Sequence, residues 1–481
     1  MKARVAFEST LLLASSALAL LTLTGCPLSD DYSIDPNYGT GGSSSSGGMS
    51  MADGGASLAG ASGSGAGGAS SGGASSGGAP SGVGGSDVAC SETSCSGACC
   101  DSGCVDLSSD PQNCGRCGNA CSVGRSCDAG SCETGWVPIA APPADFVARE
   151  KAAYATFAGK VFVWGGIDAT GTELRSGAIY DATLDTWQSI HIDKQTPSAR
   201  ELATAVWTGS AVLVFGGRNG GGDVALRDAA LYDPIVDRWT KAVDSPTARV
   251  APLAAAYGDM VVSWSGLSAT LIPLAGADRY RASMDSWAPA MLMNGPPRLG
   301  HTACAAAGGF FYVYGGIDTM LAPTDKAYRY NFAMNNWVTL EHGPGPRFDA
   351  FGASDGTRFY VWGGRDSAMV IRNGSSYDAQ WAPLGTLGAP VGRYAPLRES
   401  GWTFDLEDSG FAVLGGFDAN GEMLHDGGIY SRANDAWTNI PAWNSDEDHG
   451  FGVSVHAGSE VVVFGGRTGD SLTNTGERYS L

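Results

Sequence analysis

The chain has 481 residues, of which 43 % are hydrophobic, and its 49 acidic and 29 basic side chains give a formal net charge of −20. Acidic residues outnumber basic ones both up to residue 135 (12 against 4) and after it (37 against 25). This distribution argues against a nucleic-acid-binding protein, which needs a basic surface, and is typical of a solubilising acidic surface.

Residues 1–25 have the pattern of an export signal. Lys2 and Arg4 precede an apolar stretch from Leu11 to Leu23, and Leu23-Thr24-Gly25-Cys26 follows. This pattern resembles a bacterial lipoprotein signal with its lipobox, which implies cleavage before Cys26 and lipidation of that cysteine. The alternatives are an ordinary secretory signal and a transmembrane anchor, for which the apolar stretch is short. The residue after Cys26 is Pro27 rather than the Asp of an inner-membrane retention signal. The resemblance therefore favours the outer membrane of a diderm bacterium.

Residues 26–88 are predicted to be a disordered tether. They consist almost entirely of Gly, Ser and Ala, with acidic residues near the start, and such a composition cannot bury enough apolar surface to fold. A flexible coil of about 60 residues spans roughly 40 to 45 Å between its ends. We expect it to hold a folded head away from a membrane surface.

Ten of the twelve cysteines fall within residues 89–133. In an exported chain this density predicts a disulfide-rich module with five bridges, whose pairing the sequence leaves open. A zinc site at Cys114 and Cys117 is the alternative. The stretch from Cys104 to Cys132 resembles the Stig1-like cysteine-rich module. The predicted disulfide cysteines are Cys90, Cys95, Cys99, Cys100, Cys104, Cys114, Cys117, Cys121, Cys127 and Cys132.

A repeat fills the rest of the chain. Seven short apolar runs end on a glycine pair, and their first positions recur every 48 to 52 residues, a period typical of propellers and solenoids. A Tyr follows each pair, usually with a Trp seven residues later, and the unit contains four β-prone runs separated by turns. The pairs are Gly165-Gly166, Gly216-Gly217, Ser265-Gly266 (degraded), Gly315-Gly316, Gly363-Gly364, Gly415-Gly416 and Gly465-Gly466.

This order of glycine pair, Tyr and Trp resembles the kelch repeat, from Trp136 to Leu481. The resemblance implies an all-β fold, a seven-bladed β-propeller over residues 135–481 with one four-stranded blade per repeat. No Trp follows Tyr479, whereas Trp136 precedes the first glycine pair by 29 residues, the interval between Trp187 and Gly216. We therefore predict that Trp136 to Ala140 form the outer strand of blade seven and close the ring.

Arginines recur at two places in the repeat. In a four-stranded meander, the loop before the inner strand and the loop after the glycine pair emerge on the same face, so both groups should share one rim. Kelch propellers that bind peptides use such arginines for acidic ligands, because the guanidinium suits bidentate carboxylate binding. The alternative is that each upstream arginine only braces the adjoining blade. The candidates are Arg149, Arg200, Arg249, Arg298, Arg347 and Arg393 upstream of the pairs, and Arg218, Arg365 and Arg467 directly after them.

The sequence gives little sign of catalysis. It contains no H-E-x-x-H, G-x-S-x-G or phosphate-loop motif, and its six histidines lack ligand spacing. The kelch resemblance also allows an enzyme, because some bacterial kelch propellers act on sugars, as sialic acid epimerases do with acidic and basic residues at the channel. The candidate acids of that kind are Glu399, Asp405, Glu407 and Asp408 in an insertion of blade six. A solvated acidic loop is the alternative. The segments Asp168–Gly171 and Asp418–Gly421 are interpreted as hairpin turns rather than calcium sites.

The sequence thus predicts a lipid-anchored recognition protein that binds an extracellular or periplasmic protein or glycan through one face of its propeller. A carbohydrate-active enzyme that uses the same face is the competing hypothesis. The sequence indicates no cofactor, metal or nucleic-acid partner, and contact with a membrane only through the lipid.

Overall fold

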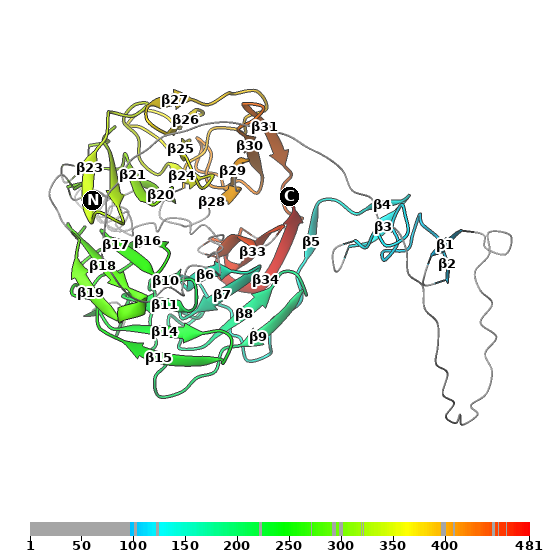
Figure 1. Ribbon diagram of the computed structural model, residues 1–481, viewed down its shortest axis with the longest axis horizontal. Helices are drawn as coiled ribbons and strands as arrows, with labels where there is room; N and C mark the ends of the chain where they lie inside the picture. Colours follow the sequence, from blue (N-terminus) through cyan, green and yellow to red (C-terminus); the bar gives the residue numbers. More distant parts are fainter. Residues whose placement is uncertain are drawn as a thin grey trace, which may run out of the picture.

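The computed structural model describes residues 97–481, apart from 101–102, 122–124, 221–223, 271, 291–294, 298–301, 319, 321, 396–400, 407–408, 445–447, 451 and 458. The predicted signal peptide, Cys26, the tether, Cys90 and Cys95 lie outside the described residues. The described chain forms a small cysteine-rich module followed by a ring of β-sheets (Figure 1).

The ring has seven blades, as predicted. Each blade is a four-stranded antiparallel sheet, and the first strands of neighbouring blades contact one another around the whole ring. The first, inner strands are β6 (Ala153–Phe157), β10 (Thr204–Trp207), β16 (Leu253–Tyr257), β20 (Ala303–Ala307), β24 (Phe351–Ser354), β28 (Gly401–Leu406) and β32 (Val453–Ala457). The second strands are β7 (Lys160–Trp164), β11 (Val212–Phe215), β17 (Met260–Trp264), β21 (Phe310–Tyr314), β25 (Phe359–Trp362), β29 (Gly410–Gly415) and β33 (Glu460–Thr468).

The third and fourth strands complete each blade toward the outside of the ring. The third strands are β8 (Gly177–Asp181), β14 (Ala229–Asp233), β18 (Ala277–Arg281), β22 (Ala327–Asn331), β26 (Gly374–Tyr377), β30 (Gly427–Ser431) and β34 (Ser471–Ser480). The fourth strands are β9 (Thr186–Ser189), β15 (Arg238–Ala242), β19 (Ser286–Pro289), β23 (Asn336–Thr339), β27 (Trp381–Pro383), β31 (Ala436–Ile440) and β5 (Trp136–Pro138). A small hairpin, β12 (Arg218–Asn219) with β13 (Val224–Ala225), and a 3-10 turn, η1 (Ala282–Met284), are additions to this pattern.

The N-terminal strand closes the ring, as predicted. Strand β5 pairs antiparallel with β34, with Trp136 opposite Tyr479. The strand is shorter than the predicted Trp136 to Ala140, but the Ile139 N–H still donates to the Gly476 carbonyl at 3.0 Å. Blade seven therefore combines both ends of the propeller sequence, and β5 covers the edge of β34 that would otherwise stay open.

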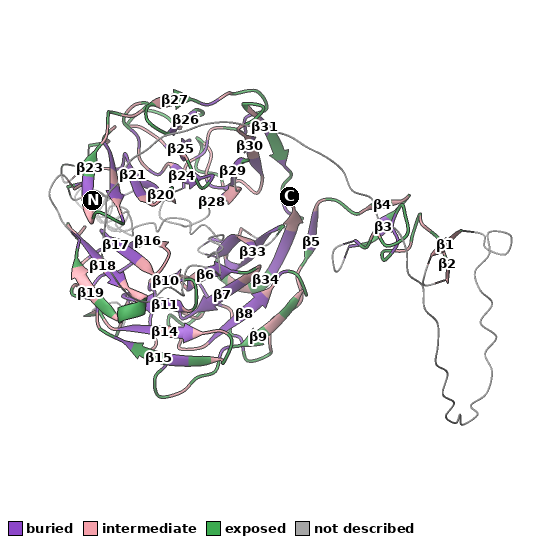
Figure 2. Ribbon diagram, viewed as in Figure 1, coloured by how far each residue is buried: buried purple, intermediate pink, exposed green. Residues whose placement is uncertain are grey.

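The Tyr and Trp of each repeat face each other across the third and fourth strands. In blade five the turn between these strands is three residues shorter than in blade one, yet Tyr377 still lies opposite Trp381. The rings fill the space between blades; those of Trp164 in blade one and Trp239 in blade two have centroids 5.5 Å apart. Burial is accordingly greatest in the inner and second strands, whereas the outer strands alternate between buried and exposed positions (Figure 2).

The glycine pairs adopt the left-handed backbone conformation that the repeat requires. Gly166 has a φ of +87°, and a Cβ atom there would lie 2.4 Å from the Glu150 carbonyl oxygen. Only glycine avoids both the strain and the clash. In the degraded pair, Ser265 keeps this conformation with a φ of 58°, so the substitution costs backbone strain but does not change the turn.

The cysteine-rich module consists of two hairpins, β1 (Ala98–Cys100) with β2 (Gly103–Val105), and β3 (Cys127–Asp128) with β4 (Ser131–Cys132). Its cysteines form disulfides, which include Cys100–Cys117, Cys114–Cys127 and Cys121–Cys132; Cys99 and Cys104 are also disulfide-bonded. Cys114 and Cys117, the residues of the alternative zinc site, therefore belong to two different bridges. Within the described part of the chain, no helix is long and apolar enough to span a membrane.

Candidate binding face

The loops before the inner strands and the loops after the glycine pairs lie together, as the meander predicts. Backbone bridges join them at Glu150 and Ile167 in blade one, and at Glu201 and Arg218 in blade two. Equivalent bridges join Val250 to Leu267, Phe348 to Arg365, Tyr394 to Phe417 and Gly450 to Arg467. We call the surface formed by these bridges, and by the turns that directly follow the glycine pairs, the loop face.

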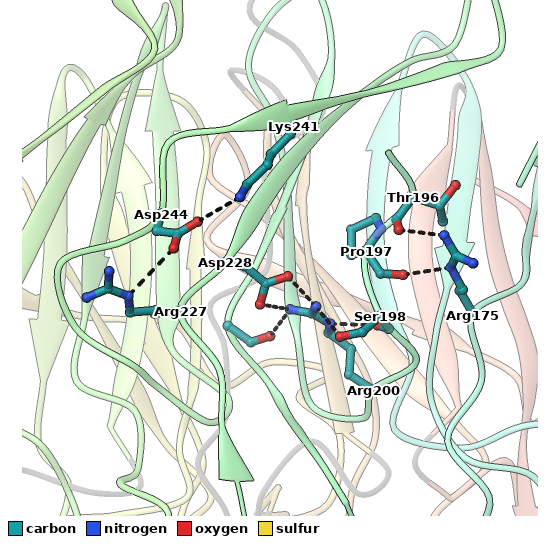
Figure 3. A network of polar contacts seen from close by, with 10 residues as sticks. Arg175, Thr196, Pro197, Ser198, Arg200, Arg227, Asp228, Lys241 and Asp244 are labelled. Carbon is teal, nitrogen blue, oxygen red and sulfur yellow. Dashed lines mark hydrogen bonds and ion pairs between the residues drawn. The ribbon is translucent and has the colours of Figure 1, made fainter. Parts of the chain in front are cut away.

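The upstream arginines lie below this face. Arg200 has no exposed surface; its Nη1 donates to the Gly216 carbonyl at 3.0 Å and its guanidinium binds both carboxylate oxygens of Asp228, at 2.9 and 2.5 Å (Figure 3). The same contact, from Nη1 to the carbonyl of the first residue of the pair, recurs in five blades. The contacts are Arg149 to Gly165, Arg200 to Gly216, Arg249 to Ser265, Arg347 to Gly363 and Arg393 to Gly415.

These five arginines brace the fold, as the alternative expected, but each braces its own blade rather than the adjoining one. All are buried, and their guanidinium groups are committed to the backbone and side chains of their own blade. Burial of the Arg149 guanidinium lowers its pKa to about 10, because removal from water disfavours the charged form. We therefore assign no ligand to Arg149, Arg200, Arg249, Arg347 or Arg393, and Arg298 lies outside the described residues.

Blade seven, which has no upstream arginine, uses a histidine in its place. His449 is buried, and its Nδ1 donates to the Gly465 carbonyl at 2.8 Å. It precedes Gly465 by 16 residues, the interval that separates Arg200 from Gly216. This residue was not predicted from the sequence, although aligning the repeats on the glycine pair rather than on residue type would have found it.

The three arginines after the pairs do lie on the loop face, each beside a carboxylate. Arg218 Nε lies 2.7 Å from Glu201 Oε1, and Arg467 Nε lies 2.7 Å from Glu150 Oε2. Lys151 Nζ lies between these two carboxylates, 3.7 Å from Glu150 and 3.6 Å from Glu201. These five residues form a row of alternating charge across blades seven, one and two, which we call the charged row.

Arg365 has a different environment on the opposite side of the ring. Its Nη2 lies 2.8 Å from Asp349 Oδ2, and its guanidinium carbon lies 4.8 Å from the Phe348 ring centroid and 4.3 Å from that of Tyr394. Aromatic faces attract a guanidinium. The Tyr394 ring in turn lies 5.8 Å from that of Phe417, so this side of the loop face surrounds its ion pair with aromatic rings.

Three neighbouring blades carry exposed Ile or Met side chains in the turns of the same face, and Val224 in the corresponding turn of blade two is also exposed. Ile272, Met320 and Met369 lie in the turns after the glycine pairs of blades three, four and five and are 53 %, 81 % and 65 % exposed. We call these residues the apolar tips. The equivalent turns of blades one and six carry Thr170-Gly171 and Asn420-Gly421 instead.

The turns of blades one and six are hairpin turns, as interpreted from the sequence. Asp168 accepts hydrogen bonds from the backbone N–H groups of Thr170 and Thr172 at 2.8 and 3.0 Å. Asp418 does the same for Asn420 and Glu422, at 2.8 and 2.9 Å. The hydrogen bond from the Thr170 hydroxyl, followed by that from the Thr172 N–H, lowers the pKa of the Asp168 carboxyl, and the bond from the Glu422 N–H lowers that of Asp418. The backbone bonds account for an Asp at the start of each turn.

Of the acidic candidates of blade six, the structure describes Asp405, which lies away from the loop face. Asp405 lies within the inner strand β28 and near its far end, rather than in an insertion; Leu406 pairs with Gly410 while Gly401 pairs with Gly415. Its Oδ1 accepts from the Ser354 N–H at 2.6 Å. The extra residues of this blade therefore lie before β28. Glu399, Glu407 and Asp408 lie outside the described residues.

Comparison with known proteins relates the module alone to a family. Residues 84–135 match the stigma-specific STIG1-like protein family, which agrees with the predicted resemblance. No curated protein matches the chain. The match covers the cysteine-rich region and none of the propeller, so the propeller must be interpreted from its own geometry.

Proposed function

We propose that this protein is an exported, lipid-anchored recognition protein whose propeller binds a protein partner on the loop face. A β-propeller fold suggests a protein-binding role, because its repeated scaffold supports loops that can vary from blade to blade. Kelch-type repeats, the lipoprotein signal at Leu23–Cys26 and the tether at 26–88 support the rest of this proposal.

One observation carries the choice of surface. The bracing contact below the loop face is the same in blade after blade, whereas the side chains on the face differ from blade to blade. A residue that serves only the fold should follow the repeat, but the apolar tips occur on three adjacent blades and the charged row on three others. Exposed Ile and Met side chains are costly to leave in water and are typical of contact surfaces.

The apolar tips favour a protein over a glycan. We propose a partner that presents apolar side chains to blades three to five and carboxylates to the arginines at the edge of that area. Arg365, whose side chain is 28 % exposed, stands on blade five, beside this area. Such a partner would combine apolar burial with charge-assisted hydrogen bonds.

The sharpest test changes the tips without touching the fold. In the full chain, Ile272→Asp, Met320→Asp and Met369→Asp together should abolish capture of the partner, and the melting temperature should not change. The matched control is Leu184→Asp, Ile235→Asp and Met334→Asp, three exposed residues in turns between third and fourth strands, at the other end of the propeller. Affinity capture from an envelope extract of the source organism should return a partner with the wild type and the control but not with the tip variant.

Simultaneous replacement of Arg218, Arg365 and Arg467 by Ala is a weaker test. Each charge-assisted contact to a ligand is worth about 1.5 to 3 kcal/mol, but Glu201, Asp349 and Glu150 are buried, and each would lose its ion pair with an arginine. Loss of binding could then follow from loss of structure. Retained capture by the tip variant would contradict the proposed surface.

The competing hypothesis is a sugar epimerase, and it makes a different prediction. If the isolated full-length protein turned over a sialic-acid-type sugar, and Glu399→Gln with Glu407→Gln abolished turnover, the protein would be an enzyme and the proposal would fail. The anchor is tested separately: Cys26→Ser should abolish labelling by a radioactive fatty acid, and a wild type that takes up no label would not be a lipoprotein.

A further inference from the structure

A buried arginine of the cysteine-rich module fastens the module to the propeller. The Arg125 and Glu460 side chains are 2 % and 4 % exposed, and Arg125 Nη2 lies 3.2 Å from Glu460 Oε2. Glu460 is the first residue of β33, in blade seven. Removing one partner of such a pair leaves the other charge buried and uncompensated, which is strongly destabilising.

The same guanidinium also holds the segment that leads into the closing strand. Arg125 Nη1 donates to the carbonyl oxygens of Glu133 and Gly135, at 3.2 and 2.9 Å. Gly135 directly precedes Trp136, the first residue of β5. One side chain thus joins the start of β5 to β33 in the same blade.

This contact crosses the seam where the two ends of the propeller sequence meet. Glu460 pairs with Ser480, and the next pair along β34 is Tyr479 with Trp136. The ladder between β5 and β34 contains only three residue pairs. Arg125 therefore bridges the end of a short ladder, where fraying would begin.

Disulfides on both sides of Arg125 fix the position of its backbone. Arg125 lies between Cys121, which is bonded to Cys132, and Cys127, which is bonded to Cys114. Cys127 and Cys132 also face each other across the β3–β4 hairpin, and the Glu133 N–H donates to the Ser126 carbonyl at 2.8 Å. These bridges and this hydrogen bond hold the backbone of Arg125 close to Glu133 and Gly135, whose carbonyl oxygens its guanidinium binds.

We propose that the cysteine-rich module stabilises closure of the propeller through the contacts of Arg125, and that this stabilisation depends on the disulfides of the module. Reduction of Cys121–Cys132 by a dithiol breaks the S–S bond and gives two cysteine thiols; two electrons and two protons pass from the dithiol, which becomes a disulfide. Arg125 then leaves Glu460 and Gly135, and β5 separates from β34 more often. This inference concerns ring closure and is independent of the proposed partner.

Hydrogen–deuterium exchange on the full chain tests whether Arg125 stabilises the pairing of β5 with β34. Peptides that cover residues 136–139 and 471–480 measure exchange at the seam. A peptide that covers β18 and β19 measures exchange in blade three, away from the seam. When mass spectrometry shows that all disulfides are intact, Arg125→Met should speed exchange at the seam about tenfold and leave exchange of the blade-three peptide unchanged. Arg116→Met, an exposed arginine in the same module, should behave as the wild type.

The reductant provides the second arm. Dithiothreitol should raise the exchange rate of the wild-type seam peptides to that of Arg125→Met. It should not raise the rate further in that variant, because the contacts of the guanidinium are already absent. Cys121→Ser with Cys132→Ser should reproduce the reduced state without reductant. If Arg125→Met fails to fold, Arg125→Lys, which keeps the charge but cannot span the same acceptors, should show a smaller increase. Unchanged seam exchange in either arginine variant, or equal reductant sensitivity with and without Arg125, would overturn the proposal.

Discussion

Trp136 and Tyr479 stand opposite each other across the seam of the propeller, 343 positions apart in the sequence, with ring centroids 5.4 Å apart. In every other blade the facing Trp follows its Tyr by four or seven residues. The seam therefore reproduces a local contact of the repeat with residues from opposite ends of the domain.

Trp136→Ala should lower the free energy of unfolding by about 3 to 5 kcal/mol, the usual cost of removing a buried aromatic ring. Trp136 is buried and its Nε1 donates to the Pro441 carbonyl at 2.7 Å. Trp136→Phe keeps a ring at the seam and should cost much less. Urea denaturation of both variants measures the difference; equal midpoints for the wild type and Trp136→Ala would mean that the seam contributes nothing to stability.

The histidine of blade seven should behave as a bracing residue. His449→Ala removes the donor to the buried Gly465 carbonyl, and we expect a loss of about 1 to 3 kcal/mol, the cost of an unsatisfied buried polar group. His342→Ala is the control, because that side chain is 69 % exposed and lies beside the partly exposed Asp325. In thermal denaturation, His449→Ala should melt at a clearly lower temperature than His342→Ala. Similar melting temperatures would contradict the bracing role of His449.

The arginine braces should not tolerate lysine. Arg200→Lys keeps the charge but loses the fork that binds Asp228 and the Gly216 carbonyl together, so we expect a loss of about 1.5 to 3 kcal/mol. Arg227→Lys, whose side chain is 60 % exposed and is labelled beside Asp244 in Figure 3, should change stability little. Chemical denaturation measures both, and an Arg200→Lys variant as stable as the Arg227→Lys control would contradict the bracing assignment.

Asp405 should make stability depend on pH. Burial raises the pKa of its carboxyl from 3.8 to about 8, with a further contribution from the charge of Asp355, and its Oδ2 has no hydrogen-bond partner among the described residues. The folded protein then retains a proton that the unfolded chain releases between about pH 4 and pH 8. The free energy of unfolding should therefore fall as pH rises through this window.

Asp405→Asn tests that dependence directly. The amide keeps an acceptor for the Ser354 N–H but cannot ionise, so the variant should lose part of the decline in stability between pH 5 and pH 8. Urea denaturation at several pH values, with the wild type as reference, measures this difference. Parallel pH profiles for the two proteins would show that Asp405 does not carry the effect.

The repeat by itself determined the architecture of the propeller. Positive φ at the glycine pairs and the fixed spacing of Tyr and Trp are local requirements, so Gly166, Tyr180 and Trp187 could be placed from sequence. The closing strand could be placed too, because Trp136 stands at the interval of the repeat from Gly165. Cysteine density likewise indicated the module, although it could not pair Cys100 with Cys117.

Tertiary structure decided which charged residues are available at the surface. Arg200 and Arg218 are equally basic in the sequence, yet one is enclosed below the loop face and the other lies on it, because burial depends on packing between segments that sequence spacing does not describe. For the same reason, His449 could replace an arginine unnoticed and Asp405 could lie in a strand rather than in a loop. The link from Arg125 to Glu460 joins residues 335 positions apart, and no local pattern encodes such a contact.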